Sequence, residues 1–310
     1  MKRRELRELA EGGVLLTSRA LEAGWPRRSL TRHLRGEGWV RLQTGAWAEP
    51  GAARNLVTQL RAVQLLRPQL VVSHCSAAVL WRIETLTHPS PAPLEFTDTE
   101  LIHRRRDKGV RVHRIPLTGD EVAERNGLRF TTVNRTLADL LRSGPRDEAL
   151  VAVESALSRR RVGRVRRAPL TSLTTLTATL DTPLQGAARA RGWLDLADPR
   201  SGSPAETITR LRMYDAGLYP ESQAELLTPD GRQVFLDFFF RREGLAVEIE
   251  GYAYHGTRDS HRRDMARFNR ILQCPEVRSL LRYSAEDVFH RPAQIVQEIG
   301  GALRRPVGAA

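Results

Sequence analysis

Residues 236–251, LDFFFRREGLAVEIEG, contain two short apolar runs interrupted by acidic side chains. The runs 236–240 and 245–249 are rich in β-forming residues and are separated by the polar turn RREG, so they predict a β-hairpin. Alternate side chains of a strand share a face, so Glu248 and Glu250 point the same way, and Asp237 comes from the paired strand. We therefore expect these three carboxylates to lie on one face of a sheet.

A cluster of three carboxylates on a sheet indicates a bound cation. Burying carboxylates without counterions costs free energy, and oxygen ligands are those that Mg²⁺ prefers. Asp237, Glu248 and Glu250 are therefore the predicted ligands of Mg²⁺, or of Mn²⁺ in its place, which would activate a water beside a phosphodiester. The alternative is that the hairpin lies at a sheet surface and its acids are simply solvated, because acid-x-acid pairs are common on exposed strands.

The segments around the hairpin follow the order helix, three strands, helix, strand. Ser203 and Pro204 begin the first helix, with Glu206 in its first turn. After the hairpin come the helical segment HRRDMARFNRIL (261–272) and the strand VRSLLRYS (277–284). This order resembles the core of the PD-(D/E)xK nuclease superfamily, and more narrowly the family related to the very-short-patch mismatch repair endonucleases. The family pattern is matched across residues 200–303 by Ser203, Glu206, Asp237, Glu248, Glu250, Gly251, His255, Arg263, Asp264 and Arg267.

The resemblance implies a fold and an activity for the C-terminal third of the chain. The implied fold is a restriction-endonuclease-like α/β/α core in residues 201–305, and the implied activity is metal-dependent hydrolysis of phosphodiester bonds. The implied catalytic residues are Glu206, Asp237, Glu248, Glu250 and His255, with Asp237 and Glu248 holding the metal, Glu250 binding it or orienting the water, Glu206 assisting and His255 shuttling a proton.

One position departs from the superfamily pattern. Glu250 stands where the superfamily has a lysine, and no lysine follows Lys108 in this chain. The replacement is usual in this subfamily. The lysine's proposed task, which is to position the attacking water and stabilise charge, falls to His255, to Arg263 or to no residue.

The charge of the chain is unevenly distributed. The net charge of +13 and the pI near 10.9 indicate a polyanionic partner. Residues 201–310 contain 15 arginines and 15 acids, so the excess of 34 basic over 21 acidic residues lies in residues 1–200. If nucleic acid is bound, we expect the first two thirds of the chain to make most of the contacts.

Several classes of protein are disfavoured by the sequence. Cys75 and Cys274 lie in unrelated contexts and give neither a CxxC motif nor a disulfide framework. No apolar run approaches the length needed to cross a bilayer, and MKRRELRELAEGG lacks the apolar core of a signal peptide. We therefore expect a cytoplasmic protein of two or three domains with no membrane partner. The oligomeric state is left open.

Residues 1–50 have the pattern of a winged helix-turn-helix. Leu6 and Leu9 mark a first helix, Thr17 caps a second helix, SRALEAG (18–24), and WPRRSLTRHLRGEGW (25–39) supplies a third. Leu30 and Leu34 are expected on the inner face of the third helix. The strands VRL (40–42) and AWA (46–48), joined by QTG, form the predicted wing.

A basic third helix after a tight turn suits the major groove of DNA, with the wing on the phosphates. The alternative is a protein-interaction module with a solvated basic face. The segments GGVLLTSRALEAG and RRSLTRHLRGEGWVRLQTGAWA resemble the N-terminal domain of AbiEi-family antitoxins, which are regarded as DNA-binding autorepressors of type IV toxin–antitoxin pairs. The predicted DNA contacts are Arg27, Arg28, Ser29, Arg32 and His33 on the helix and Arg41, Gln43 and Thr44 on the wing.

Residues 55–165 alternate between predicted helices and strands and predict an α+β domain. SHCSAAVLW (73–81) and TTVNRTLADL (131–140) resemble the body of AbiEi-like proteins. No second ligand lies at metal spacing near His74, so a structural hydrogen bond is favoured over a metal or catalytic role. Arg135 and Asp139 are four residues apart on a predicted helix and can pair with each other. Residues 166–200 predict a helical bridge.

The segment SRRRVGRVRRAP (158–169) contains six arginines and no acid. It is either a solvated helix end or linker, or a phosphate-binding patch beside the nuclease-like domain, and the sequence supports both readings equally.

Taken together, the sequence predicts a multi-domain α/β protein and leaves two functions open. The first is a DNA-binding protein with a Mg²⁺-dependent endonuclease-like domain. The second is an AbiEi-like antitoxin or autorepressor whose nuclease fold does not cut, and a cognate toxin is the partner that this reading implies. RNA in place of DNA is not distinguished, because winged helices and basic patches accept either backbone.

Overall fold

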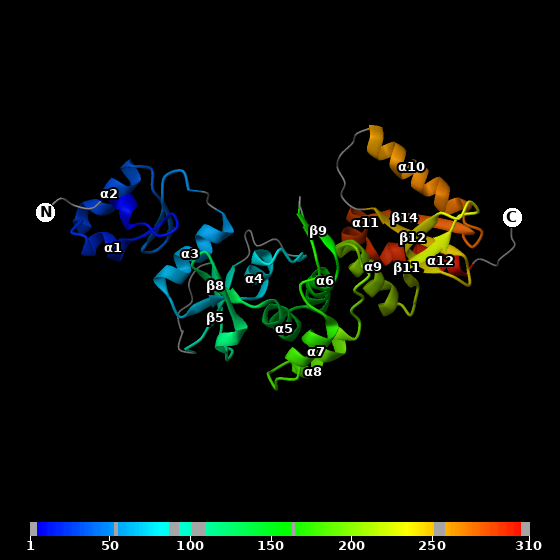
Figure 1. The fold of residues 1–310 in the computed structure, drawn as a ribbon, viewed down its shortest axis with the longest axis horizontal. Coiled ribbons are helices and arrows are strands. Elements are labelled where there is room, and N and C mark those ends of the chain that lie inside the picture. The colour runs from blue at the N-terminus through cyan, green and yellow to red at the C-terminus, as the bar shows by residue number, and fades with distance from the viewer. Residues whose placement is uncertain are drawn as a thin grey trace. The chain divides into compact units, whose positions relative to one another are not determined.

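The computed structural model describes residues 5–52, 55–86, 93–100, 109–162, 165–250 and 258–304, without the side chains of residues 162 and 258–264. Helices and strands are mixed throughout the chain, which confirms the predicted multi-domain α/β class (Figure 1). The chain forms two compact units. Unit 1 contains Met1–Trp81 and Thr87–Asp139, and unit 2 contains Arg82–Leu86 and Leu140–Ala310.

The first part of unit 1 contains a small sheet with the predicted helices packed against it. The sheet has the order β1-β3-β2 and is antiparallel. Leu30 and Leu34 are buried together with Trp39 and Trp47, so the inner face of the third predicted helix is confirmed. The elements are η1 (Leu6–Leu9), β1 (Val14–Leu16), α1 (Thr17–Glu22), α2 (Arg27–Gly36), β2 (Val40–Gln43) and β3 (Ala46–Ala48).

Two details of this part differ from the sequence-based expectation. β1 was not predicted, because a continuous apolar run of three residues has no alternating pattern, yet all three residues are buried and pair with β3. The prediction that Thr17 caps the second helix was wrong. Thr17 is the first residue of α1, and its hydroxyl accepts a hydrogen bond from Trp47 Nε1 at 3.2 Å.

The second part of unit 1 is a five-stranded mixed sheet with the order β6-β5-β4-β8-β7. Leu60 of α3 and Ala77 of α4 pack on Val72, Phe96 and Phe130 of the sheet, so the core lies between the sheet and these helices. The elements are α3 (Leu56–Leu66), β4 (Leu70–Val72), α4 (His74–Leu80), β5 (Leu94–Asp98), β6 (Val110–His113), η2 (Gly119–Glu121), β7 (Val122–Arg125), β8 (Leu128–Thr131) and α5 (Val133–Ser143).

Unit 2 resumes at Leu140, within α5, and includes a helix that the sequence predicts as part of the preceding domain, residues 55–165. α6 (Arg146–Leu157) packs on α9 (Pro204–Asp215), where Glu154 forms a buried ion pair with Arg210. A hairpin of β9 (Arg160–Val162) and β10 (Val165–Arg167) follows α6. The predicted helical bridge then contains α7 (Leu173–Leu180) and α8 (Ala187–Leu194).

The C-terminal part of unit 2 is a four-stranded sheet between two layers of helices. Its strands are β11 (Glu221–Leu227), β12 (Gln233–Phe240), β13 (Leu245–Glu250) and β14 (Ser279–Ser284), in that order, and only the β13–β14 pair is parallel. α9, α11 (Ala285–His290) and α12 (Pro292–Leu303) cover one face, and α10 (Arg258–Gln273) covers the other. This confirms the predicted element order and an α/β/α layering.

In the part of the chain that the structure describes, none of the helices has the length and apolar character needed to cross a membrane.

Candidate functional site

The predicted hairpin is present, and its backbone ladder ends beside Asp237. β12 and β13 pair as far as Phe238 and Val247. Beyond this pair, side chains take the place of backbone partners. The Ile249 amide donates to Asp237 Oδ2 at 2.8 Å, and the Asp237 amide donates to Glu248 Oε1 at 3.1 Å. The carboxylates of Asp237 and Glu248 are therefore fixed where the ladder ends.

The alternation of side chains along β12 also changes at Asp237. Leu236 and Phe239 both pack on the α10 side of the sheet, while Phe238 and Phe240 pack on the α9 side. Residues three apart cannot share a face of a regular strand, so the two-residue period is broken between Leu236 and Phe239. Asp237 lies at this step, and its carboxylate can therefore contact groups from both layers.

Glu206 reaches the same place from the first turn of α9. Ser203 caps the helix, since its Oγ accepts a hydrogen bond from the Glu206 amide at 3.2 Å, and Pro204 follows it as predicted. The Glu206 carboxylate accepts hydrogen bonds from the Gly202 amide at 2.7 Å and from Gln223 Nε2 at 3.0 Å. The side chain is buried, with only 8% of Glu206 exposed.

Gln223 of β11 joins Glu206 to Asp237. Its Nε2 also donates to Asp237 Oδ1 at 3.1 Å, so one amide group holds a carboxylate of α9 and a carboxylate of β12. Gln223 has a φ of 49°, in the left-handed region that non-glycine residues rarely adopt. Gln223 cannot be recognised from the sequence, because a glutamine in a strand gives no signal until the register of β11 on β12 is known.

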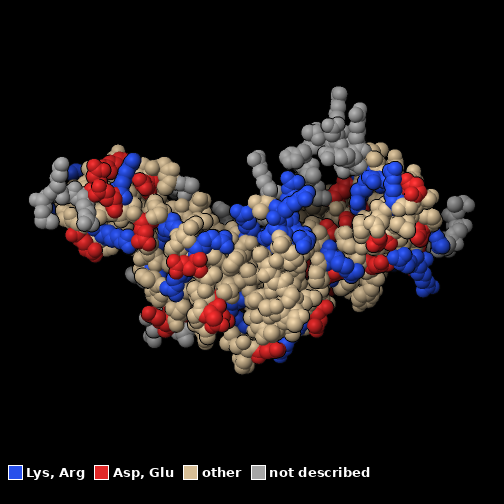
Figure 2. All heavy atoms as spheres, in the orientation of Figure 1, with Lys and Arg blue, Asp and Glu red and all other residues tan. Residues whose placement is uncertain are grey.

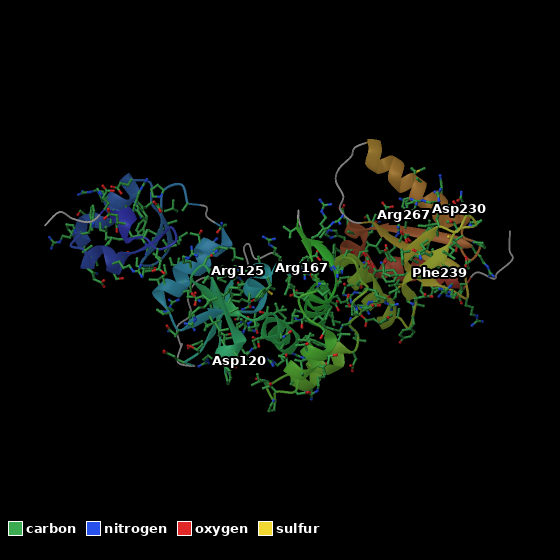
Figure 3. All side chains as sticks on the ribbon, in the orientation of Figure 1. Asp120, Arg125, Arg167, Asp230, Phe239 and Arg267 are labelled. Atoms are coloured by element: carbon green, nitrogen blue, oxygen red, sulfur yellow. The ribbon has the colours of Figure 1, made fainter. Side chains whose placement is uncertain are left out.

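Arg267 of α10 supplies a positive charge to this cluster. Figure 3 labels its position in the C-terminal part of the chain. Its Nη2 donates to Glu248 Oε2 at 2.7 Å and to the Phe235 carbonyl at 2.8 Å. The contact compensates part of the charge of Glu248 and ties α10 to β12. Arg267 is one of the residues of the family pattern that the sequence matched.

The three clustered carboxylates resist being ionised together. Burial and, next, the negative charge of Asp237 raise the pKa of Glu206 to about 7. Burial raises the pKa of Asp237, and burial together with the charge of Asp237 raises the pKa of Glu248, against the opposing effect of Arg267. A divalent cation placed among these groups would remove the cost.

The donor set fits a hard divalent cation held by two carboxylates. Mg²⁺ is commonly bound through one or two carboxylates and several waters, and Asp237 and Glu248 can provide them. Among the described residues, no three His, Cys, Asp or Glu side chains already form a group that could hold a metal ion. Binding of Mg²⁺ or Mn²⁺ by Asp237, Glu248 and Glu250 stays a prediction. The geometry favours Asp237 and Glu248 as the metal ligands, with Glu206 beside them.

Glu250 and His255 stand differently from the rest of the predicted catalytic set. Glu250 is exposed and forms an ion pair with Arg282 of β14, so the structure joins Glu206 rather than Glu250 to Asp237. Arg282 neutralises Glu250, which could not be foreseen because the two residues are far apart in the sequence. His255 and Gly251 lie outside the described residues, as do the side chains of Arg263 and Asp264.

The predicted DNA-binding surface of unit 1 is largely solvent-exposed. Arg27, Arg28 and Arg32 of α2 are exposed, and none of them forms an ion pair with a described residue. His33 is exposed but pairs with Glu37, with 2.8 Å between Nε2 and Oε1. Three cations on the outer face of α2 are therefore available to a polyanion.

The other predicted contacts are more confined. Ser29 is half-buried and its Oγ donates to the Pro26 carbonyl at 3.4 Å. On the wing, Arg41 Nη2 donates to Thr44 Oγ1 at 3.2 Å, and Gln43 is half-buried. Arg41 and Thr44 are exposed and lie together at the turn of the wing, as the wing prediction requires.

The two structural roles predicted for the middle region are confirmed. His74 is buried and its Nδ1 lies 2.9 Å from Ser73 Oγ. Burial lowers the pKa of His74 to about 4, which keeps the imidazole neutral at neutral pH. Arg135 and Asp139 form a buried ion pair with an Nε–Oδ2 distance of 2.9 Å. These residues stabilise unit 1, and their contacts support a structural role and not a catalytic or metal-binding one.

Comparisons with known proteins do not identify the chain. No protein-family model matches it, and no curated protein matches it. Among solved structures, the chain is similar to one described as the crystal structure of the RV2827C protein from Mycobacterium tuberculosis, with 19% identity and a TM-score of 0.41. The similarity covers 73% of this chain and 86% of that chain. A likeness at this level carries no functional argument, so function rests on the geometry.

Proposed function

We propose that the chain is a DNA-binding protein whose C-terminal sheet carries a divalent-cation-dependent endonuclease site. The observation that supports the proposal best is the cluster of Glu206, Asp237 and Glu248 where the β12–β13 ladder ends. The cluster is buried, its pKa values are raised, and Gln223 and Arg267 hold it in place. Stability alone does not favour such a cluster, whereas binding a cation does.

Each residue of the cluster has a role in this proposal. Asp237 and Glu248 would hold Mg²⁺ or Mn²⁺, which when bound activates water and neutralises charge on the phosphodiester. Glu206, with a pKa of about 7, is partly deprotonated at neutral pH and can accept a proton from the attacking water. Arg267 orients Glu248. The family resemblance adds His255 as a proton shuttle and Glu250 as a residue that orients the water, whereas the structure pairs Glu250 with Arg282.

The exposed arginines of α2 provide the DNA contacts of the proposal. Arg28 and Arg32 are one turn apart on the helix, and Arg27 precedes them, so all three can reach one groove of a duplex. Arg41 at the wing can contact a neighbouring phosphate. This surface would bring the duplex to the protein, while the acid cluster would hydrolyse it.

The test is cleavage of supercoiled plasmid by the purified full chain with Mg²⁺ or Mn²⁺. We expect the wild type to nick the plasmid and Asp237→Asn to lose at least about two orders of magnitude in rate, since that variant removes a metal ligand. Asp230→Asn is the matched control, because Asp230 is an exposed acid that pairs with Arg232 outside the cluster. No cleavage by the wild type, or equal cleavage by Asp237→Asn, contradicts the proposal.

The second candidate is an AbiEi-like antitoxin or autorepressor with an inactive nuclease fold, which would have a cognate toxin as its partner. Glu250 in place of the superfamily's lysine favours it, while the exposed arginines of α2, which form no ion pair with a described residue, suit both candidates. Under this proposal the plasmid stays intact, and Asp237→Asn keeps full binding to the protein's own upstream DNA. Arg28→Ala with Arg32→Ala weakens that binding under either proposal.

A further inference from the structure

The β9–β10 hairpin carries arginines at paired positions on both of its faces. In its register Arg161 lies opposite Arg166, and Arg160 lies opposite Arg167. Alternate residues of a strand point to opposite faces, so these two arginine pairs occupy different faces of the hairpin. The two faces have different surroundings.

The inner pair, Arg160 and Arg167, anchors the hairpin. Arg160 is buried and donates to Glu84 Oε2 at 2.7 Å, to the Ser201 carbonyl at 3.1 Å and to Ser158 Oγ at 3.1 Å. Arg167 donates to the Ser155 carbonyl of α6 and to its Oγ at 3.3 Å. Burial lowers the pKa of the half-buried Arg167, and the positive charge of Arg160 lowers it further. The hairpin is thus fixed to the body of unit 2.

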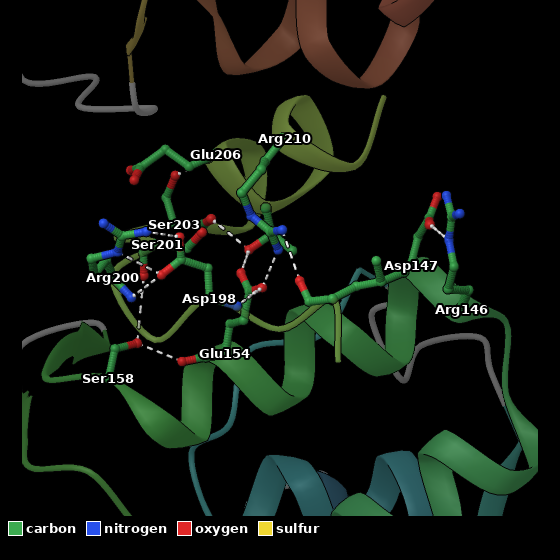
Figure 4. A network of polar contacts seen from close by, with 12 residues as sticks. Arg146, Asp147, Glu154, Ser158, Asp198, Arg200, Ser201, Ser203, Glu206 and Arg210 are labelled. Carbon is green, nitrogen blue, oxygen red and sulfur yellow. Dashed lines mark hydrogen bonds and ion pairs between the residues drawn. The ribbon is translucent and has the colours of Figure 1, made fainter. Parts of the chain in front are cut away.

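The anchor leads directly to the acid cluster. Ser201, which Arg160 holds, precedes Gly202, and the Gly202 amide donates to Glu206. The positive charge of Arg160 offsets part of the rise in the pKa of Glu206, so the two groups are near enough to interact. Figure 4 shows Ser158, Ser201, Ser203 and Glu206 within one network of polar contacts. The hairpin is therefore connected to the acid cluster by the hydrogen bonds of Arg160 to Ser201 and of Gly202 to Glu206.

The same network contains the contact between α6 and α9. Glu154 of α6 pairs with Arg210 of α9, and its carboxylate also accepts hydrogen bonds from the Asp198 amide at 2.8 Å and from the Thr207 hydroxyl at 2.6 Å (Figure 4). α6 leads into β9, and α9 carries Glu206 in its first turn. The position of the hairpin relative to Glu206 is therefore fixed by buried polar contacts.

The outer pair, Arg161 and Arg166, faces solvent. Both side chains are exposed, and neither forms an ion pair with a described residue. Like charges directly opposite each other in an antiparallel pair destabilise the strands. Figure 2 shows basic side chains gathered where Figure 1 places β9. Guanidinium groups bind phosphate in bidentate fashion. The two neighbouring guanidinium groups of Arg161 and Arg166 can therefore bind phosphates of a nucleic acid.

We propose that Arg161 and Arg166 bind backbone phosphates of duplex DNA and hold it beside Glu206, Asp237 and Glu248. This inference rests on the proposed nuclease function and deepens it, because it gives the cleavage unit its own DNA contact. Residues 201–310 have no net charge, as 15 arginines match 15 acids. The acid cluster repels a polyanion, and the positive charge of the hairpin offsets this repulsion.

The experiment measures binding of a short fluorescein-labelled duplex to the full chain by anisotropy over a range of salt concentrations, with EDTA present. All variants carry Arg28→Ala and Arg32→Ala, which remove the contribution of α2. We expect Arg161→Ala with Arg166→Ala to lower the affinity on the order of tenfold and to reduce the salt slope by about 1.8, from two contacts of about 0.9 each. Arg161→Lys with Arg166→Lys should recover most of the slope.

The matched control is Arg242→Ala with Arg278→Ala. Both arginines are exposed, lie in unit 2, and form no ion pair with a described residue, so the control removes the same charge away from the hairpin. Equal loss in the control and the hairpin variant, or no loss in either, overturns the inference. Stronger binding of a single-stranded RNA of the same length, with the same dependence on Arg161 and Arg166, overturns the assignment to duplex DNA.

The two proposals fail in distinguishable ways. Binding without metal does not depend on cleavage, so an intact plasmid contradicts the nuclease proposal and leaves the hairpin result to stand. Normal binding by the hairpin variant, together with cleavage that Asp237→Asn abolishes, contradicts only the hairpin inference.

Discussion

Glu206 is placed where two electrostatic effects oppose each other. The first turn of α9 favours a negative charge, and the Gly202 amide donates to the carboxylate. Burial and the neighbouring charge of Asp237 favour the protonated form. They outweigh the helix terminus and the hydrogen bond, so the pKa of Glu206 is raised to about 7. The result is a carboxyl group that changes protonation near neutral pH without any histidine.

The raised pKa of Glu206 gives the folded state a defined dependence on pH. The pKa rises from 4.5 to about 7 on folding, so between these values the folded chain binds more protons than the unfolded chain. Stability is then highest below pH 4.5 as far as this group is concerned, falls as the pH rises through that window, and stays low above pH 7.

Glu206→Gln should remove this dependence. At about pH 8 we expect the variant to be more stable than the wild type by roughly 3 kcal/mol, and at about pH 5 the difference should fall to about 1 kcal/mol or less. Thermal unfolding followed by circular dichroism at both pH values measures it. Glu225→Gln, on an exposed residue of β11, is the control and should show no such difference. An equal shift at both pH values would contradict the assigned ionisation.

At the scale of elements, α6 and α9 are joined by the buried Glu154–Arg210 ion pair. Both side chains are almost fully buried, and Arg210 also donates to the Leu196 carbonyl at 2.7 Å. Removing one partner of a buried pair leaves the other charge uncompensated, which costs far more than the pair itself contributes. This contact holds the helix that leads to the hairpin against the helix that carries Glu206.

Arg210→Ala should therefore destabilise unit 2 by about 3–5 kcal/mol. Arg146→Ala, which breaks the more exposed pair with Asp215, should cost about 1 kcal/mol or less. Chemical denaturation of the full chain, with separate probes for the two units, compares them. If both substitutions cost the same, the Glu154–Arg210 pair does not have the structural role assigned to it.

Much of the C-terminal unit could be predicted from the sequence, because its signals are local. The hairpin follows from two β-forming runs joined by the polar turn RREG, and the start of α9 follows from Ser203 and Pro204. The helices in the first part of unit 1 were predictable for the same reason, since Gly, Pro and leucine spacing mark them.

What could not be predicted depends on contacts between distant residues. Gln223 joins the acid cluster only because β11 lies in register with β12. Glu250 leaves the cluster because β14 brings Arg282 beside it. α6 belongs to unit 2 because Glu154 meets Arg210, which is 56 residues away. None of these contacts has a signal in the spacing of one segment.

At the scale of the whole molecule, the positive charge lies on elements separate from the acid cluster. The excess of basic residues is confined to residues 1–200, which include α2 of unit 1 and the β9–β10 hairpin of unit 2. The acid cluster lies in the neutral remainder. Each unit therefore has its own basic surface, and in unit 2 that surface is tied to the cluster through Arg160.

A titration with Mn²⁺ decides whether Asp237 and Glu248 bind a divalent cation with Glu206 beside it. Electron paramagnetic resonance can titrate free Mn²⁺ against the full chain and its variants without any nucleic acid. We predict a single site that Asp237→Asn abolishes and that Glu250→Gln leaves within about threefold of the wild-type affinity, because Glu250 pairs with Arg282. No Mn²⁺ binding by the wild type, or the same binding by Asp237→Asn, would contradict it.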